Sequence, residues 1–132
     1  MKDSEEAGRG IPSLRTVAMP GDANPNGDIF GGWLMSQMDL AGGTYAVHEA
    51  CGPVVTVAVD AMTFHKPVKI GDQVSCYCST RKVGNTSLTV RVETFIRGRR
   101  RGELIEEKVT EALFTFVAID EQGRPRPVSA GI

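Results

Sequence analysis

The stretch that decides the fold is GWLMSQMDLAGGTYAVHEA, residues 32–50, which holds the only strong helical pattern in the 132-residue chain. At about 100° per residue, most of its apolar side chains fall within one broad arc of a helix. The arc consists of Trp33, Leu34, Met35, Met38, Ala41, Gly42, Tyr45 and Ala46. Asp39 lies at the edge of this arc and His48 lies outside it. We therefore expect a helix packed against a sheet, with Asp39 at the border of the packed face.

After this helix the apolar residues change to a period of two, which is typical of β-strands. Four such runs, at residues 55–64, 74–79, 88–97 and 109–119, follow a short extended run at residues 14–19. Short glycine-containing connections at residues 83–86 and 98–102 predict antiparallel hairpins. The pattern thus predicts an α+β fold with one long helix and an antiparallel sheet of about five strands.

The rest of the chain sets the expected domain limits. Residues 1–12 are charged and polar, lack the apolar stretch of a signal peptide, and are expected to form a flexible leader. Residues 13–127 are expected to form a single domain with one core, and residues 128–132 a short tail. One helix cannot cover both faces of a five-stranded sheet, so we expect a second subunit to cover part of what remains.

Composition excludes several classes of function. The formal net charge of −1, from 15 basic and 16 acidic side chains, predicts no general attraction to nucleic acid or to an anionic membrane. No segment approaches the roughly 20 apolar residues of a membrane helix. An odd set of three cysteines argues against a disulfide framework, and with His48 and His65 as the only histidines we expect no metal site. We expect a cytoplasmic protein.

Three segments together resemble a known family. They are AMPGDANPNGDIFGGWLMSQMDLAGG at residues 18–43, MTFHKPVKIGD at residues 62–72 and TEALFTFVAID at residues 110–120. The turn-rich loop, paired glycines, helix carboxylate and Lys-Pro-Val-x-x-Gly-Asp run resemble the YciA-like bacterial acyl-CoA thioesterases over residues 14–127. The resemblance implies a hotdog fold, in which a curved sheet wraps one central helix. It also implies hydrolysis of acyl-CoA to a free acid and CoA, with no cofactor.

The resemblance further implies a catalytic site. In that family a carboxylate on the central helix is catalytic, and the matching residue is Asp39. An asparagine in the loop before the helix also belongs to the site, and the matching residue is Asn24. The family's sites lie between two subunits, which implies a homodimer, and three such dimers commonly form a hexamer. Whether Asp39 acts as a general base or as a nucleophile stays open.

The chemistry of thioester hydrolysis adds further candidates. The start of the helix at Gly31 and Gly32 offers backbone N–H groups to a developing oxyanion, and we count Gly32 as catalytic. Coenzyme A carries several negative charges, so side chains that can bind phosphate are predicted to contact it. These candidates are His65, Lys66, Arg81, Lys82, Thr86 and Ser87. The predicted walls of the acyl pocket are Met35, Met62 and Phe64, for which packing in the core is an equally good explanation.

Two other functions are open to this pattern. A hotdog dehydratase or hydratase also acts on acyl thioesters, but it pairs a histidine with a carboxylate, and neither His48 nor His65 is expected beside Asp39. A non-enzymatic acyl-CoA-binding protein would have little use for that carboxylate, and residues 1–12 and 121–132 are too few for an effector domain. Thioester hydrolysis is therefore the predicted function.

Overall fold

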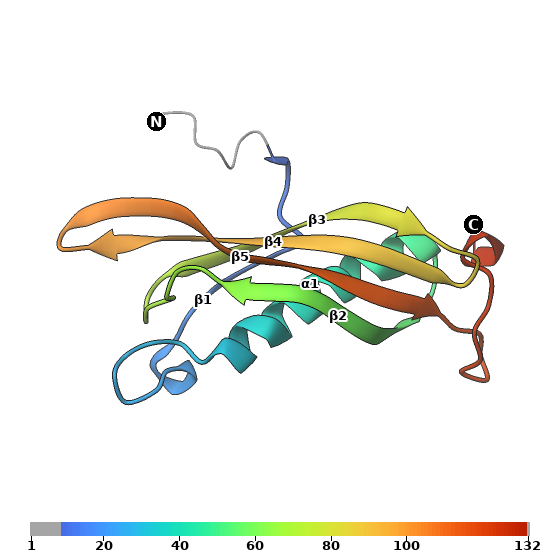
Figure 1. The fold of residues 1–132 in the computed structure, drawn as a ribbon, viewed down its shortest axis with the longest axis horizontal. Helices are drawn as coiled ribbons and strands as arrows, with labels where there is room; N and C mark the ends of the chain where they lie inside the picture. The colour runs from blue at the N-terminus through green and yellow to red at the C-terminus, as the bar shows by residue number, and fades with distance from the viewer. Residues whose placement is uncertain (1–8, 132) are drawn as a thin grey trace.

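One long helix, α1 (Gly31–Ala50), lies against one face of a five-stranded antiparallel sheet in the computed structural model, which describes residues 9–131 (Figure 1). The strands are β1 (Leu14–Val17), β2 (Val54–Phe64), β3 (Gln73–Val83), β4 (Ser87–Arg100) and β5 (Glu103–Ala118). Their order across the sheet is β1-β3-β4-β5-β2, so β1 and β2 form the two edges. The short 3-10 helices η2 (Pro20–Asp22) and η3 (Val128–Gly131) flank this unit. The predicted α+β architecture is confirmed.

Close contact between α1 and the sheet is made possible by Gly42. A Cβ atom at Gly42 would lie 3.0 Å from the ring of Phe116 and 3.3 Å from Val92, which is tighter than ordinary packing allows. Leu34, Met38 and Ala46 are buried on the same side of the helix. Close helix–sheet packing therefore explains the glycine at this position.

The N-terminal turns of α1 are less covered than the apolar arc predicts. Met35 was expected within the packed arc, but it is 39% exposed. Only the side that carries Trp33 and Leu34 contacts the core, while Gly31 and Gly32 are exposed. The helix ends at Cys51, whose left-handed backbone (φ 52°) allows Gly52 N–H to donate to Val47 O at 3.1 Å.

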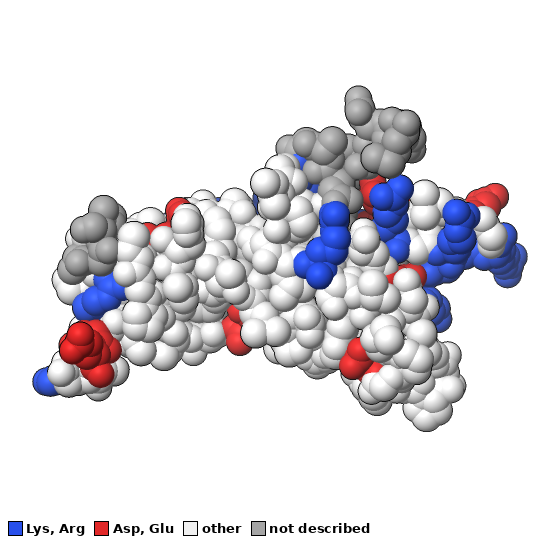
Figure 2. All heavy atoms as spheres, turned by 180° about the vertical axis from the view of Figure 1, so that it is seen from behind, with Lys and Arg blue, Asp and Glu red and all other residues white. Residues whose placement is uncertain are grey.

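The two hairpins differ from each other. The β3–β4 connection occupies residues 84–86, within the predicted range of residues 83–86, because Val83 still belongs to β3. The β4–β5 loop predicted at residues 98–102 is wrong, because the strands continue to Arg100 and from Glu103. Only Arg101 and Gly102 form the turn, and both have positive φ angles, 53° and 83°, as a tight two-residue hairpin requires. This hairpin projects at one end of the molecule, where basic side chains gather in the rear view (Figure 2).

The C-terminal residues pack against the C-terminal ends of α1 and β5. Val128 is 6% exposed and contacts Ala50 and Ala118, so the packed chain extends past the expected boundary at residue 127. Arg126 Nη2 donates to Ala50 O at 2.9 Å, and its Nε donates to Ile119 O at 3.1 Å. Arg126 thus joins the end of the helix to the end of β5.

The expected leader lies only partly within the structure. Residues 1–8 are outside the described residues. Within residues 9–12, the Arg9 guanidinium lies 3.4 Å from the centroid of the Phe95 ring, a cation–π arrangement on the face of the sheet opposite α1.

Replacing Arg126 with alanine should destabilise the fold, because it removes the donors that satisfy the last carbonyls of α1 and β5. We expect a loss of roughly 1–3 kcal/mol in the free energy of unfolding, measured by denaturant titration. Arg124→Ala is the matched control, since Arg124 is exposed, and it should stay within about 0.5 kcal/mol of the parent. Equal stability of Arg126→Ala and the parent would contradict this role.

Candidate active site

Asp39 lies in an open groove of about 410 Å³ between α1 and β2. The groove is lined by Asp39, Leu40, Gly43, Thr44, Val47, Val54, Thr56 and Phe116. Thr56 Oγ1 donates a hydrogen bond to Asp39 Oδ1 at 2.7 Å, across the gap between helix and strand. Within residues 9–131, Asp39 Oδ2 accepts no hydrogen bond. The carboxylate is therefore half-buried, oriented by one hydroxyl, and open on its second oxygen.

The start of α1 presents backbone N–H groups to open space. Phe30 precedes the helix and provides no side-chain cap. Trp33 N–H and Leu34 N–H both donate to Phe30 O, whereas those of Gly31 and Gly32 have no acceptor in the described part of the chain. A Cβ atom at Gly32 would meet nothing within 4 Å. An oxygen with developing negative charge can therefore approach this end of the helix closely.

Gly32 and Asp39 share one side of α1 but are well separated along it. The two positions are seven residues apart, which corresponds to nearly two helical turns and roughly 10 Å along the helix axis. A base and an oxyanion donor must each lie about 3 Å from the reacting group. The axial separation therefore argues against Gly32 and Asp39 of a single chain serving the same thioester.

Asn24 occupies a tight turn in the loop before the helix. Its side-chain Oδ1 accepts the N–H groups of Asn26 at 2.9 Å and Asp28 at 3.1 Å. This is the Asx-turn geometry of an ordinary loop asparagine. It also leaves Nδ2 without an acceptor among residues 9–131, so the amide N–H groups are available to a ligand carbonyl.

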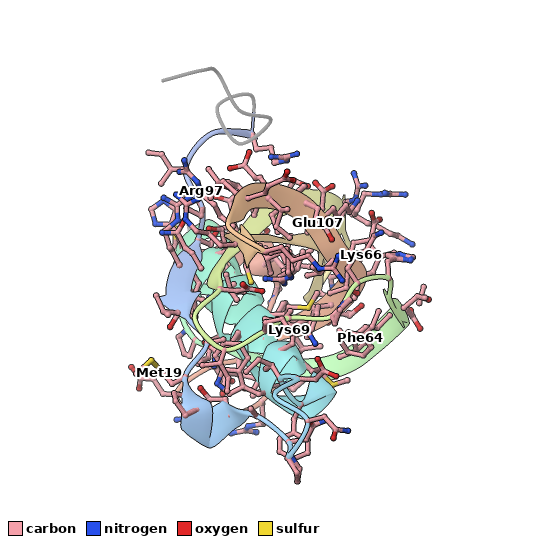
Figure 3. All side chains as sticks on the ribbon, turned by 90° about the vertical axis from the view of Figure 1, so that its left-hand side faces the viewer. Met19, Phe64, Lys66, Lys69, Arg97 and Glu107 are labelled. Carbon is pink, nitrogen blue, oxygen red and sulfur yellow. The ribbon has the colours of Figure 1, made fainter. Side chains whose placement is uncertain are left out.

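A second cavity, of about 250 Å³, lies beside the start of α1. It brings together the predicted residues Gly31, Phe64 and Lys66, and a Cβ atom on Gly31 would lie 3.4 Å from the Phe64 ring. Phe64 and Lys66 lie at the end of the molecule that Figure 3 faces. Of the other predicted residues nearby, His65 is exposed, and Met62 packs against the core.

The predicted coenzyme A ligands form two separate groups. Arg81, Lys82, Thr86 and Ser87 lie around the β3–β4 hairpin. Ser87 pairs with Val117, and Phe64 pairs with Thr110, which itself pairs with Thr94. Ser87 and Thr94 are seven residues apart on β4, which corresponds to about 23 Å. The structure therefore does not gather the six candidates of one chain around a single exit.

Thr56 is the site residue that the sequence analysis missed. In the sequence, Thr56 alternates with the exposed valines of β2. The only signal that could have identified it was a hydroxyl on the side of the strand that faces the helix. No histidine lines the groove that contains Asp39. Across residues 9–131, no group of three or more His, Cys, Asp or Glu side chains is arranged to hold a metal ion.

The two edges of the sheet have different chemistry. The edge strand β2 leaves three valines exposed, Val55 by 42%, Val57 by 55% and Val59 by 39%. The opposite edge carries Arg81 and Lys82 on β3, beyond the short β1. Charged residues protect an edge from association, whereas an apolar edge invites it. The β2 edge, next to the groove of Asp39, is therefore the surface suited to a second copy.

One central helix against an antiparallel sheet, with a carboxylate in the helix–strand groove and open N–H groups at the helix start, defines the hotdog class of thioesterases. A family model described as the thioesterase superfamily matches residues 26–103, and the chain belongs to this family.

More particular relatives follow from sequence and structure. The chain is 48% identical to the acyl-CoA thioester hydrolase YciA of Escherichia coli strain K12 over 128 residues, which cover 96% of each chain. It resembles a hexameric hotdog fold thioesterase of Campylobacter jejuni with a TM-score of 0.87 and 44% identity, covering 92% of each chain. It also resembles a hexameric thioesterase from Yersinia pestis, with a TM-score of 0.82 and 51% identity over 89% of this chain and 94% of that one. The hotdog fold is thus confirmed.

Membrane insertion through a helix has no support in the part of the chain that is described. Among residues 9–131, no helix combines the length and the apolar character needed to span a bilayer.

Proposed function

We propose that this protein hydrolyses acyl-CoA thioesters to a free carboxylic acid and CoA, in sites shared between two copies of the chain. The observation that carries the proposal is the Asp39 carboxylate, held by Thr56 at 2.7 Å in a largely apolar groove beside an unpaired strand edge. The Escherichia coli relative is named as an acyl-CoA thioester hydrolase, which supports acyl-CoA as the substrate class.

In the water route, Asp39 Oδ2 accepts a proton from water as the water oxygen forms a bond to the thioester carbon. The carbonyl oxygen becomes an oxyanion. It is stabilised by donors from the other chain, namely the N–H groups of Gly31 and Gly32 and the side-chain amide of Asn24. The C–S bond then breaks, and the CoA thiolate takes up the proton. In the alternative route, Asp39 itself attacks the carbon, CoA leaves, and water hydrolyses the resulting anhydride. Both routes require the same half-buried carboxylate.

Shared sites require a homodimer, and β2 is the edge that suits it. Pairing of two β2 strands would satisfy unpaired backbone groups and bury the exposed valines of both chains. Antiparallel pairing would also set the two α1 helices side by side in opposite directions, so that the start of one lies near the middle of the other. The hexameric state of the two solved relatives supports further assembly into three dimers.

The two groups of candidate CoA ligands fit such an arrangement. Lys66, near the helix start, and Arg81 and Lys82, near the β3–β4 hairpin, lie at opposite ends of one chain. In an antiparallel dimer, opposite ends of two chains meet. We infer that basic residues of both chains bind the phosphates of one CoA.

A cytoplasmic location is part of the proposal. All three cysteines, Cys51, Cys76 and Cys78, are free thiols, as is usual in a reducing compartment. Burial raises the pKa of the Cys76 thiol to about 11, so this side chain is an inert core residue rather than a nucleophile.

Asp39→Asn should lower kcat for acyl-CoA hydrolysis by at least about 100-fold, because an amide cannot accept the proton or attack the thioester. Thiol release from acyl-CoAs of several chain lengths measures this loss. Glu49→Gln, at an exposed position of the same helix, is the matched control and should retain parent activity. Parent-like turnover of Asp39→Asn would refute the assignment.

Thr56→Val removes the hydroxyl that, among residues 9–131, is the one donor to the Asp39 carboxylate, and it preserves side-chain volume. We expect kcat to fall about 10-fold, since a misdirected base loses catalytic geometry, and Thr56→Ser should restore most of it. The same thiol-release assay measures kcat for the parent and for both variants. If the valine and serine variants are equally active, the hydrogen bond has no catalytic role.

Val57→Lys should separate the subunits, because it places a charge in the centre of the apolar β2 edge. Sedimentation velocity should then show a smaller species. In the thiol-release assay, this species should lack thioesterase activity. Ser79→Lys makes the same change at an exposed position of β3 and should leave assembly and activity unchanged. A dissociated Val57→Lys protein that is still active would contradict sites shared across β2.

A further inference from the structure

The orientation of Asn24 depends on Asp28. The N–H of Asp28 donates to Asn24 Oδ1 at 3.1 Å, and the carbonyl of Asp28 accepts the N–H of Asn24 at 2.8 Å. These two bonds close the loop, and together with the N–H of Asn26, which donates to the same Asn24 Oδ1 at 2.9 Å, they hold the Asn24 side chain. Any contact that fixes Asp28 therefore also fixes the direction of the Asn24 amide.

Lys69 is the residue that holds Asp28 from outside the loop. Its ammonium group forms an ion pair with Asp28 Oδ1, and the two residues form an isolated antiparallel β-bridge. Ile29 N–H donates to Val68 O at 2.9 Å and extends this contact by one residue. Both charged side chains are about two-fifths exposed, at 40% and 39%, so dissolved salt can reach the pair.

The segment that carries Lys69 is itself firmly anchored. Lys69 N–H donates to Asp72 Oδ2 at 2.9 Å, and Asp72 is only 2% exposed. Arg100 on β4 donates to both oxygens of Asp72, at 2.9 and 2.8 Å. Gly98 leaves room for this carboxylate, because a Cβ atom there would overlap Asp72 Oδ1. The position of Lys69 is thus tied to the sheet, at the end of the molecule that Figure 3 faces.

We propose that Lys69 is a positioning residue for thioester hydrolysis, which acts through Asp28 to keep the Asn24 amide aimed at the substrate carbonyl. This inference rests on the proposed function. Backbone contacts of Asp28 and Ile29 with residues 68 and 69 remain without the ion pair, so its loss should loosen the Asn24 loop relative to the reacting group rather than release it. Small displacements of a catalytic donor lower the rate of the chemical step more than they weaken substrate binding.

Substitution of Lys69 tests the proposal directly. Lys69→Met should lower kcat about 10-fold with little change in KM, and Lys69→Arg, which keeps the ion pair, should retain most of kcat. Lys108→Met is the matched control, because Lys108 is also ion-paired and 31% exposed, but pairs with Glu93 and Glu111 away from the loop. It should keep the parent kcat. If Lys69→Met does not fold, Asp28→Asn breaks the same pair from the other side.

Two readouts separate positioning from general stability. Raising NaCl from about 0.05 to about 0.5 M should lower the parent kcat at saturating substrate, because salt screens the exposed pair, and should have little effect on Lys69→Met. In an Asn24→Ala background, Lys69→Met should cause no further loss of kcat, since its effect passes through Asn24. The same loss in both backgrounds, or the same salt response in both proteins, would overturn the inference.

Hydrogen–deuterium exchange distinguishes failure of this inference from failure of the proposed function. Backbone amides of residues 20–30 should exchange faster in Lys69→Met than in the parent and in Lys108→Met. A parent protein that releases no thiol from acyl-CoA would refute the function while this comparison still tests the loop. Unchanged exchange would show that Lys69 does not hold the loop.

Discussion

The close approach of α1 to the sheet at Gly42 determines where the rest of the site lies. With no side chain at this position, the helix lies so near Phe116 and Val92 that an added Cβ atom would be 3.0 and 3.3 Å from them, closer than most Cβ contacts. That contact fixes the rotation of the helix about its axis. Because the side carrying Gly42 faces the sheet, the side carrying Gly32, Asp39 and Gly43 faces β2 and the surface. The Asp39 carboxylate, to which we assign the chemistry, is thus placed by a packing contact that takes no part in it.

Much of this arrangement could be predicted from local patterns. The helical arc located α1 to within one residue, and the alternation of β2 to β5 located each long strand. The position of Asp39 at the border of the arc was also predictable, since rotation along a helix is regular. Met35 was the exception within the arc. The arc describes the helix alone, whereas burial depends on which side of the helix the sheet covers, and Met35 lies on the side left exposed while Leu34 and Met38 are buried.

Features that depend on contacts across the fold could not be predicted. Thr56 and Asp39 are 17 residues apart and meet only because the helix returns beside β2. Arg100 was assigned to a loop, because a run of arginines between glycines resembles an exposed turn. In the fold it binds the buried Asp72, and this partner makes a continued strand favourable. The separation of Arg81 from Lys66 likewise requires the strand pairing, which sequence spacing does not contain.

The rigid separation of Gly32 and Asp39 links the proposed catalysis to assembly. α1 contains no proline and runs without interruption from Gly31 to Ala50, so its two functional positions stay almost two turns apart whatever the loops do. In the proposed dimer, a second helix running the opposite way would bring N–H donors beside the carboxylate. The apolar β2 edge that favours this association also borders the groove of Asp39. If two chains pair along β2 as proposed, the surface that an isolated chain leaves exposed is also the one that completes both sites, and stability and activity should depend on the same contact.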